Sequence, residues 1–121
     1  MNILYAEDDK MMQKAVVHSL IRLGYEVTTV DDGREAVDAI EQENFDLIIL
    51  DLFMPRLSGF EVVEIIRKEL KNLTPILILS RSHQDEAADK AFRAGANEFI
   101  VKPFDPEELI VKITRMLTSK L

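Results

Sequence analysis

Short apolar runs alternate along the chain with longer stretches in which apolar residues recur every three or four positions. The runs lie at residues 2–6, 25–30, 47–50, 76–79 and 97–101. Their lengths and their β-branched and aliphatic composition are typical of strands, and the stretches after them have the stripe of amphipathic helices. Strands that alternate with helices favour right-handed crossovers between parallel strands. The pattern therefore predicts an α/β fold with a doubly wound, five-stranded parallel sheet and five helices.

Signals at the ends of the helical stretches support this division. We expect a first helix over Lys10–Leu23, a third that ends near Asn72, and a fourth from about Gln84 to Ala94 with Gly95 as its stop signal. Each of these stretches carries apolar residues at helical spacing. The fourth helix is expected to turn four residues inward: Ala87, Ala88, Ala91 and Phe92.

The run DLIILDLFMP, residues 46–55, contains four consecutive apolar residues that end abruptly at Asp51. A continuous apolar strand of this kind is covered on both faces, as in a parallel sheet between two layers of helices. Asp51 would then lie at the carboxyl end of a central strand, where open α/β sheets bind ligands. A carboxylate so close to the core needs hydrogen bonds, a cation or a proton. Taken alone, Asp51 could also be a residue that ends the strand in a turn.

Polar residues follow the other predicted strands at the same edge of the sheet. They are Glu7 and Asp8 after the first strand, Ser80 at the end of the fourth and Lys102 after the fifth. Three neighbouring carboxylates would repel one another unless a hard cation such as Mg²⁺ lay among them. A hydroxyl and an ammonium group beside that metal could hold an anion. The set suits stabilisation of a transferring phosphoryl group, with Asp51 as nucleophile.

Composition limits the alternatives. The chain has 121 residues, 47% of them hydrophobic, which fits one domain over residues 1–121. A net charge of −7 and a pI near 4.8 argue against direct binding of nucleic acid or of anionic membranes. The absence of cysteine excludes thiolate zinc sites. No secretory signal or apolar span of membrane length is present, so we expect a cytoplasmic location.

Four segments carry a resemblance to a known family: ILYAEDD, DLFMPRLSG, ILILS and FIVKPF. In this order and at these intervals they resemble the receiver domain of response regulators from bacterial two-component, or phosphorelay, systems, and the resemblance covers the chain from end to end. It implies a flavodoxin-like sheet with strand order 2-1-3-4-5.

The resemblance also implies roles for the acidic residues. Asp51 resembles the phosphoacceptor of the family. Glu7 and Asp8 resemble the acid pair that holds Mg²⁺, directly or through water, together with Asp51 and the backbone carbonyl of Phe53. Asp9, the third acid after the first strand, is expected to be the N-cap of the following helix and to face away from the site.

Further roles implied by the resemblance concern the phosphorylated state. Lys102 would pair with one phosphoryl oxygen and Ser80 would donate a hydrogen bond to another. Phe99 matches the aromatic position that turns inward when the hydroxyl moves, although its own pattern, without the resemblance, is more often that of a core residue. The Lys102–Pro103 bond is one that the family usually has in cis.

The implied function is a signalling switch rather than an enzyme; the domain would assist only its own phosphorylation and dephosphorylation. The phosphoryl group would come from a sensor histidine kinase or a histidine phosphotransfer protein, and His18, in a basic row on the first helix, could belong to the docking surface or to a solvated face. The expected output surface is that of helix 4, strand 5 and helix 5, and the downstream effector is unknown. Mixed charges leave open a homodimer through helices 4 and 5: Asp89, Lys90, Arg93, Glu108, Lys112 and Arg115.

Three other classes of protein fit the sequence less well. A phosphatase of the haloacid-dehalogenase type also uses an aspartyl nucleophile and Mg²⁺, but it needs a second acid two residues after the nucleophile, where this chain has Phe53. A flavodoxin-like cofactor binder would need a phosphate loop in place of the acidic AEDDKMM. A phosphorylation-independent interaction module would not need the complete set of acids, hydroxyl and lysine.

Two rim positions differ from the commonest family pattern. Phe53 is bulky and apolar, and it could screen an acyl phosphate from attacking water. Arg81 replaces a small residue directly after the switch serine and adds charge at the rim. We therefore expect slow self-dephosphorylation.

Overall fold

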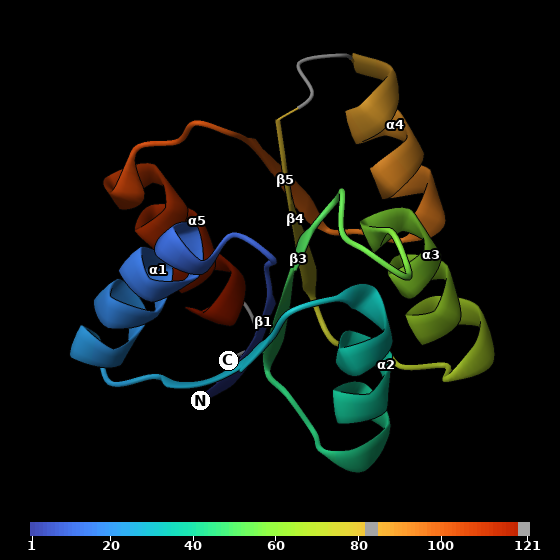
Figure 1. Ribbon diagram of the computed structural model, residues 1–121, viewed down its shortest axis with the longest axis horizontal. Helices are drawn as coiled ribbons and strands as arrows, with labels where there is room; N and C mark the ends of the chain where they lie inside the picture. The colour runs from blue at the N-terminus through green and yellow to red at the C-terminus, as the bar shows by residue number, and fades with distance from the viewer. Residues whose placement is uncertain (82–84, 119–121) are drawn as a thin grey trace.

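The computed structural model describes residues 1–81 and 85–118, and it contains a five-stranded sheet flanked by helices (Figure 1). The strands are β1 Asn2–Ala6, β2 Glu26–Val30, β3 Leu47–Asp51, β4 Ile76–Ser80 and β5 Glu98–Val101. The helices are α1 Lys10–Arg22, α2 Gly33–Gln42, α3 Gly59–Glu64 with a π-helical continuation η1 Ile65–Glu69, α4 Asp85–Ala94 and α5 Pro106–Thr118.

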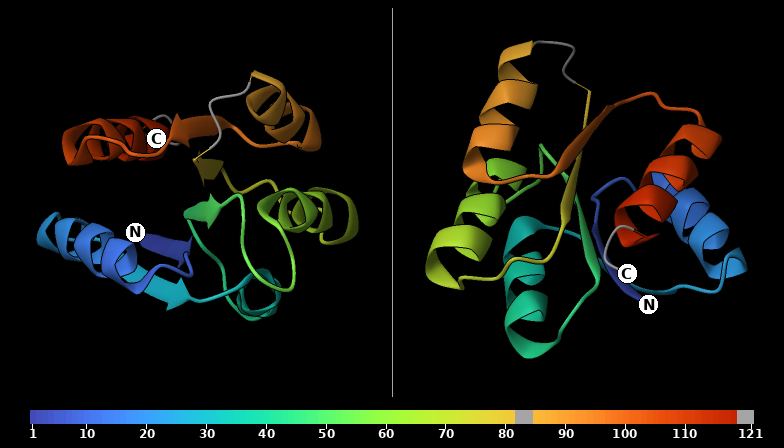
Figure 2. Two further views of the ribbon diagram at one scale, coloured as in Figure 1. Left: turned by 45° about the horizontal axis from the view of Figure 1, so that its top comes forward. Right: turned by 180° about the vertical axis from the view of Figure 1, so that it is seen from behind.

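All four strand pairings are parallel, and the strand order is β2-β1-β3-β4-β5. Helices α1 and α5 cover one face of the sheet and α2, α3 and α4 cover the other (Figure 2). The predicted doubly wound α/β fold, its strand order and its five helices are thus confirmed. Because every strand runs in the same direction, all five carboxyl ends lie at one edge of the sheet.

Alternation along the strands divides the core into two layers. In β1, Leu4 and Ala6 pack with α2, α3 and α4, whereas Ile3 and Tyr5 pack with α1 and α5. Residues of β3 alternate in the same way, and every residue of that strand is buried. This explains why the central run is apolar at consecutive positions: successive side chains enter different cores.

Several helix ends agree with their sequence signals. Asp9 is the N-cap of α1, and its carboxylate accepts hydrogen bonds from two backbone N–H groups of the first turn. Gly95 ends α4 with a φ of +122°, a left-handed conformation that favours glycine. The predicted start of this helix at Gln84, and His83 before it, lie outside the described residues.

The third and fourth helices differ in detail from the prediction. The third changes to a π-helical turn over Ile65–Glu69, where the N–H of Leu70 donates to the carbonyl of Ile65. In α4, Ala91 is buried but Phe92 is 46% exposed, so its predicted inward orientation is wrong. One residue turns an α-helix by about 100°, which carries Phe92 from the inward stripe to the rim.

Among the described residues, no helix is long and apolar enough to cross a membrane.

Candidate functional site

The carboxyl edge of the sheet brings together the polar residues that follow separate strands. Asp51 ends β3, Ser80 ends β4, Glu7 follows β1 and Lys102 follows β5. All four are buried. The backbone N–H of Lys102 donates to the carbonyl of Ser80 at 2.6 Å, which joins the ends of β4 and β5. Parallel strands of similar length thus place a hydroxyl, an ammonium group and two carboxylates in one region.

Three carboxylates form a compact acidic cluster. Glu7, Asp8 and Asp51 each offer an oxygen, and these oxygens lie within 4.8 Å of one another. Glu7 and Asp51 are buried, whereas Asp8 is exposed and opens the cluster to solvent. Such a set of hard oxygen donors with a solvent-facing side could hold a divalent cation that keeps part of its water shell.

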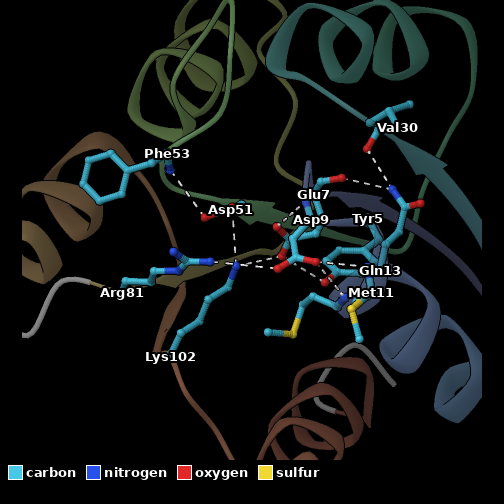
Figure 3. A network of polar contacts seen from close by, with 11 residues as sticks. Tyr5, Glu7, Asp9, Met11, Gln13, Val30, Asp51, Phe53, Arg81 and Lys102 are labelled. Atoms are coloured by element: carbon cyan, nitrogen blue, oxygen red, sulfur yellow. Dashed lines mark hydrogen bonds and ion pairs between the residues drawn. The ribbon is translucent and has the colours of Figure 1, made fainter.

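Lys102 is the buried cation of the site. Its Nζ lies 2.7 Å from Glu7 Oε1 and 3.4 Å from Asp51 Oδ2, and its side chain is only 4% exposed (Figure 3). The ammonium group thus points at the acids, as the sequence-based interpretation requires, and it pairs most closely with Glu7. One cation facing two buried carboxylates leaves the site with excess negative charge.

The excess negative charge affects the pKa of the Asp51 carboxyl group. Its pKa is raised from 3.8 to about 7, chiefly by burial and in addition by the hydrogen bond and the negative charge of Glu7. The positive charge of Lys102 and the backbone N–H of Phe53 oppose the rise. A further positive charge at this point would favour the ionised form, which is the nucleophilic one.

Glu7 is held by groups that the sequence-based interpretation did not identify. The Tyr5 hydroxyl donates to Oε1 at 3.2 Å, and the N–H of Asp9 donates to Oε2 at 3.2 Å. Gln13 Nε2 donates to the Glu7 backbone carbonyl at 3.0 Å. Burial raises the pKa of Tyr5 far above its usual value, so the phenol stays a hydrogen-bond donor. Tyr5 lies two residues before Glu7. Side chains two residues apart in an extended strand project to the same side, and this is the one sequence signal that could have revealed their proximity.

Two exposed side chains lie at the rim. Phe53 is 60% exposed, and its N–H lies 3.4 Å from Asp51 Oδ1. Arg81 lies 3.9 Å from Asp9 Oδ2. Asp9 therefore caps α1 as predicted, but it does not face away from the site, since its second oxygen is directed to the cation of Arg81 (Figure 3).

The remaining predicted residues have clear positions. Phe99 lies in β5, half-buried against the core under α2, α3 and α4. The Lys102–Pro103 peptide bond is cis, as the resemblance implied. His18 is exposed on α1. Among the charges considered for a dimer, three already form ion pairs within the chain: Arg93 with Asp89, and Lys112 with Glu98 at 3.1 Å.

The fold and the site together define a class of protein. The site suits a phosphoacceptor domain, because a flavodoxin-like sheet presents a buried carboxylate at the carboxyl end of its central strand together with an acid pair, a hydroxyl and a lysine. The sequence matches the family model described as "Response regulator receiver domain" over residues 3–114, and the chain belongs to this family. It is a phosphorylation-dependent signalling domain of a two-component system, and nothing found supports the haloacid-dehalogenase alternative.

Curated relatives include transcription regulators. The alkaline phosphatase synthesis transcriptional regulatory protein PhoP of Bacillus subtilis is 37% identical over 117 residues, which cover 95% of this chain and 48% of PhoP. The cell cycle transcriptional regulator CtrA of Caulobacter vibrioides is 38% identical over 113 residues, which cover 93% of this chain and 48% of CtrA. The chain thus spans about half the length of the curated relatives it matches.

Solved structures match over nearly the whole chain. The receiver domain of the Francisella response regulator 1452 has a TM-score of 0.94 and 30% identity, over 99% of this chain and 98% of that one. The receiver domain of the sensor histidine kinase PA1611 from Pseudomonas aeruginosa, solved with magnesium in its active site cleft, has a TM-score of 0.87 and 32% identity, over 97% of each chain.

Proposed function

We propose that Asp51 accepts a phosphoryl group from a phosphohistidine of a sensor histidine kinase or histidine phosphotransfer protein. The observation that carries this proposal is the convergence of Lys102 and of the acids Glu7 and Asp8 on the Asp51 carboxylate. In the transfer, an Asp51 oxygen attacks phosphorus, so that a P–O bond forms as the P–N bond breaks. The imidazole leaves with the electron pair of the broken bond. Lys102, fixed beside Asp51, supplies positive charge where the phosphoryl oxygens collect.

The donor set fits Mg²⁺. Glu7, Asp8 and Asp51 would hold it, with the backbone carbonyl of Phe53 as a further ligand, and the solvent-exposed side at Asp8 leaves room for waters. The magnesium in the cleft of the Pseudomonas receiver domain supports this choice of metal. When bound, Mg²⁺ supplies the Lewis-acid charge that neutralises the three acids and the entering phosphoryl group.

Phosphorylation would act as a switch through Ser80 and Phe99. Ser80, at the end of β4, would donate a hydrogen bond to a phosphoryl oxygen, and Phe99 in β5 would turn further inward. Phe99 is half-buried, so it has both an inward and an outward direction in which to move. The surface of α4, β5 and α5 would change with it and contact a downstream effector or a second copy of the domain.

We place kinase docking on α1. This helix begins beside the site, and an apolar pocket lies between it and the loop that follows β5, lined by Met12, Val16 and Phe104 among others. The exposed His18 lies on the same helix. A kinase helix laid over α1 could therefore bring its phosphohistidine to Asp51. The domain itself would be no enzyme for other substrates.

The direct test is phosphorylation by a small donor. Incubation with Mg²⁺ and acetyl phosphate should add one phosphoryl mass to the protein, located on Asp51 by peptide mapping and removed by hydroxylamine. Asp51→Asn and omission of Mg²⁺ should each abolish the addition. A wild-type protein that gains no hydroxylamine-labile phosphate under these conditions would refute the proposed function.

A further inference from the structure

The side chain of Tyr5 connects the core to the acidic cluster. It is fully buried in the core under α1 and α5, and its hydroxyl lies 3.2 Å from Glu7 Oε1. It has no exposed surface through which it could contact a partner or a substrate. Its polar contact is therefore directed at a residue of the site.

The Glu7 carboxylate has few acceptor positions left. Two carboxylate oxygens offer about four lone-pair positions. Oε1 accepts from Lys102 Nζ at 2.7 Å and from the Tyr5 hydroxyl, and Oε2 accepts from the N–H of Asp9 at 3.2 Å. These three donors engage both oxygens of the carboxylate. Because the donors lie on both oxygens, they also fix the rotation of the carboxylate plane.

The strand geometry explains why a tyrosine can make this contact. Tyr5 and Glu7 are two residues apart and project on the same side of the chain, about 6.6 Å apart along an extended backbone. A phenol is long enough to lean along β1 and present its hydroxyl at the carboxyl edge. It is also rigid, with two side-chain torsions, so it holds that hydroxyl in place at low entropic cost.

We propose that Tyr5 is a positioning residue for the metal site: its hydroxyl fixes the orientation in which the Glu7 carboxylate offers an oxygen to the cluster with Asp8 and Asp51. The inference rests on the proposed function, because it assumes that Glu7 helps to hold Mg²⁺. Hydrogen-bond partners of metal ligands typically change affinity by about 10- to 100-fold when they are removed. Tyr5 acts only through Glu7 and does not contact the reacting atoms.

Tyr5→Phe is the variant that isolates this role. It removes the hydroxyl and keeps the ring that fills the core, and Lys102 remains bonded to Glu7 Oε1. Tyr25→Phe is the matched control, since Tyr25 is partly buried against the same core and lies outside the polar network of the site.

The experiment measures Mg²⁺ binding by calorimetry on the whole 121-residue chain, together with the rate of phosphorylation by acetyl phosphate as Mg²⁺ is varied. For Tyr5→Phe we expect a dissociation constant for Mg²⁺ about 10-fold weaker and a rate at saturating Mg²⁺ within about two-fold of wild type. Melting temperatures of the three proteins are recorded alongside. A purely structural role would lower the melting temperature without this separation of affinity from saturated rate.

The outcomes separate the two claims. An affinity loss confined to Tyr5→Phe supports the positioning role. If wild type and both variants bind Mg²⁺ equally and are phosphorylated, the inference about Tyr5 is wrong while the proposed function stands. If wild type neither binds Mg²⁺ nor gains phosphate, the proposed function fails and the inference fails with it.

Discussion

A cationic side chain lies at each end of the sheet, Lys102 at one and Arg67 at the other, and the two differ in the charge of the groups that they contact. At the carboxyl edge, Lys102 contacts two carboxylates, those of Glu7 and Asp51. At the opposite edge, the half-buried Arg67 of the π-helical turn donates four hydrogen bonds to neutral oxygens within the described part of the chain. At distances of 2.7 to 3.0 Å, these are the carbonyls of Asn72, Thr74 and Gly95 and the side-chain oxygen of Asn97.

The difference separates a structural site from a reactive one. The acceptors of Arg67 precede β4 and β5, so the guanidinium ties the third helix to the start of two strands. Four hydrogen bonds engage its guanidinium, which has five N–H groups, and every one of these four acceptors is uncharged. Around Lys102, by contrast, acidic oxygens exceed cations, and charge balance improves when a metal enters. Burial alone therefore does not mark a functional cation; the surplus of opposite charge does.

The largest expected effect comes from removing the cation at the reactive end. Lys102→Met should slow phosphorylation of Asp51 by acetyl phosphate by about 100-fold or more, because positive charge is lost where charge develops during transfer. The rate is measured by mass spectrometry at saturating Mg²⁺. Lys68→Met, which alters an exposed ion pair with Glu64, is the control and should react at the wild-type rate. If Lys102→Met reacts at the wild-type rate, Lys102 takes no part in phosphoryl transfer, and the distinction between a reactive and a structural end is wrong.

Removing the cation at the other end should affect stability instead. Arg67→Met is expected to lower the free energy of unfolding by about 2 to 3 kcal/mol, since four hydrogen bonds are lost. The folded variant should accept phosphate within about two-fold of the wild-type rate. Urea denaturation measures the free energy of unfolding. The control is Arg34→Met, which removes an exposed ion pair with Asp38 and should change this free energy by less than about 0.5 kcal/mol. Loss of phosphorylation in folded Arg67→Met would contradict the assignment of this end as structural.

The charge surplus predicts a pH dependence in the absence of metal. Because the pKa of Asp51 is raised from 3.8 to about 7, its protonated form stabilises the fold. That contribution is fully present below pH 3.8 and is lost as the pH rises through about 7. Asp51→Asn, which keeps Lys102 paired with Glu7, should therefore exceed wild type in stability by about 2 to 4 kcal/mol at pH 8, at about 1.4 kcal/mol per pKa unit.

Denaturation in EDTA at pH 5 and pH 8 measures this difference between Asp51→Asn and wild type. The advantage of the variant should shrink at pH 5, and Mg²⁺ at pH 8 should reduce it by stabilising the wild type. An advantage that is the same at both pH values would mean that Asp51 titrates normally.

The smallest effect is expected at the rim. Phe53 is 60% exposed beside Asp51, so Phe53→Asn should open a path for water and shorten the lifetime of the acyl phosphate several-fold. Each tenfold change corresponds to about 1.4 kcal/mol in the barrier. Decay of the hydroxylamine-labile phosphate gives the lifetime. Leu73→Asn replaces an exposed apolar residue at the other edge and should leave it unchanged. Equal lifetimes for Phe53→Asn and wild type would make the screening interpretation wrong.

Much of the site could be predicted because it depends on order along the chain. Parallel strands align their carboxyl ends, so the residues after each strand form one list without any knowledge of side-chain angles. Asp51, Glu7 and Lys102 were found in this way, and their proximity is confirmed. The prediction for Asp9 was only partly correct. Its role as N-cap involves one carboxylate oxygen, whereas the other oxygen lies near Arg81, which the capping pattern does not specify.

Other features depend on rotation and distance, to which one-dimensional patterns are insensitive. Phe92 was assigned to the wrong side of its helix because neighbouring positions differ by about 100° in direction. The π-helical turn adds one residue to a hydrogen-bonded ring without changing the apolar pattern.

The amino-acid sequence by itself determined the order of strands and helices and the chemical groups at the sheet edge, because periodicity and strand polarity are properties of the chain. Only the tertiary structure decided which of those groups touch. That Lys102 lies nearer to Glu7 than to Asp51, and that Tyr5 reaches Glu7, follows from packing in two separate cores, where differences of less than an ångström select one partner over another.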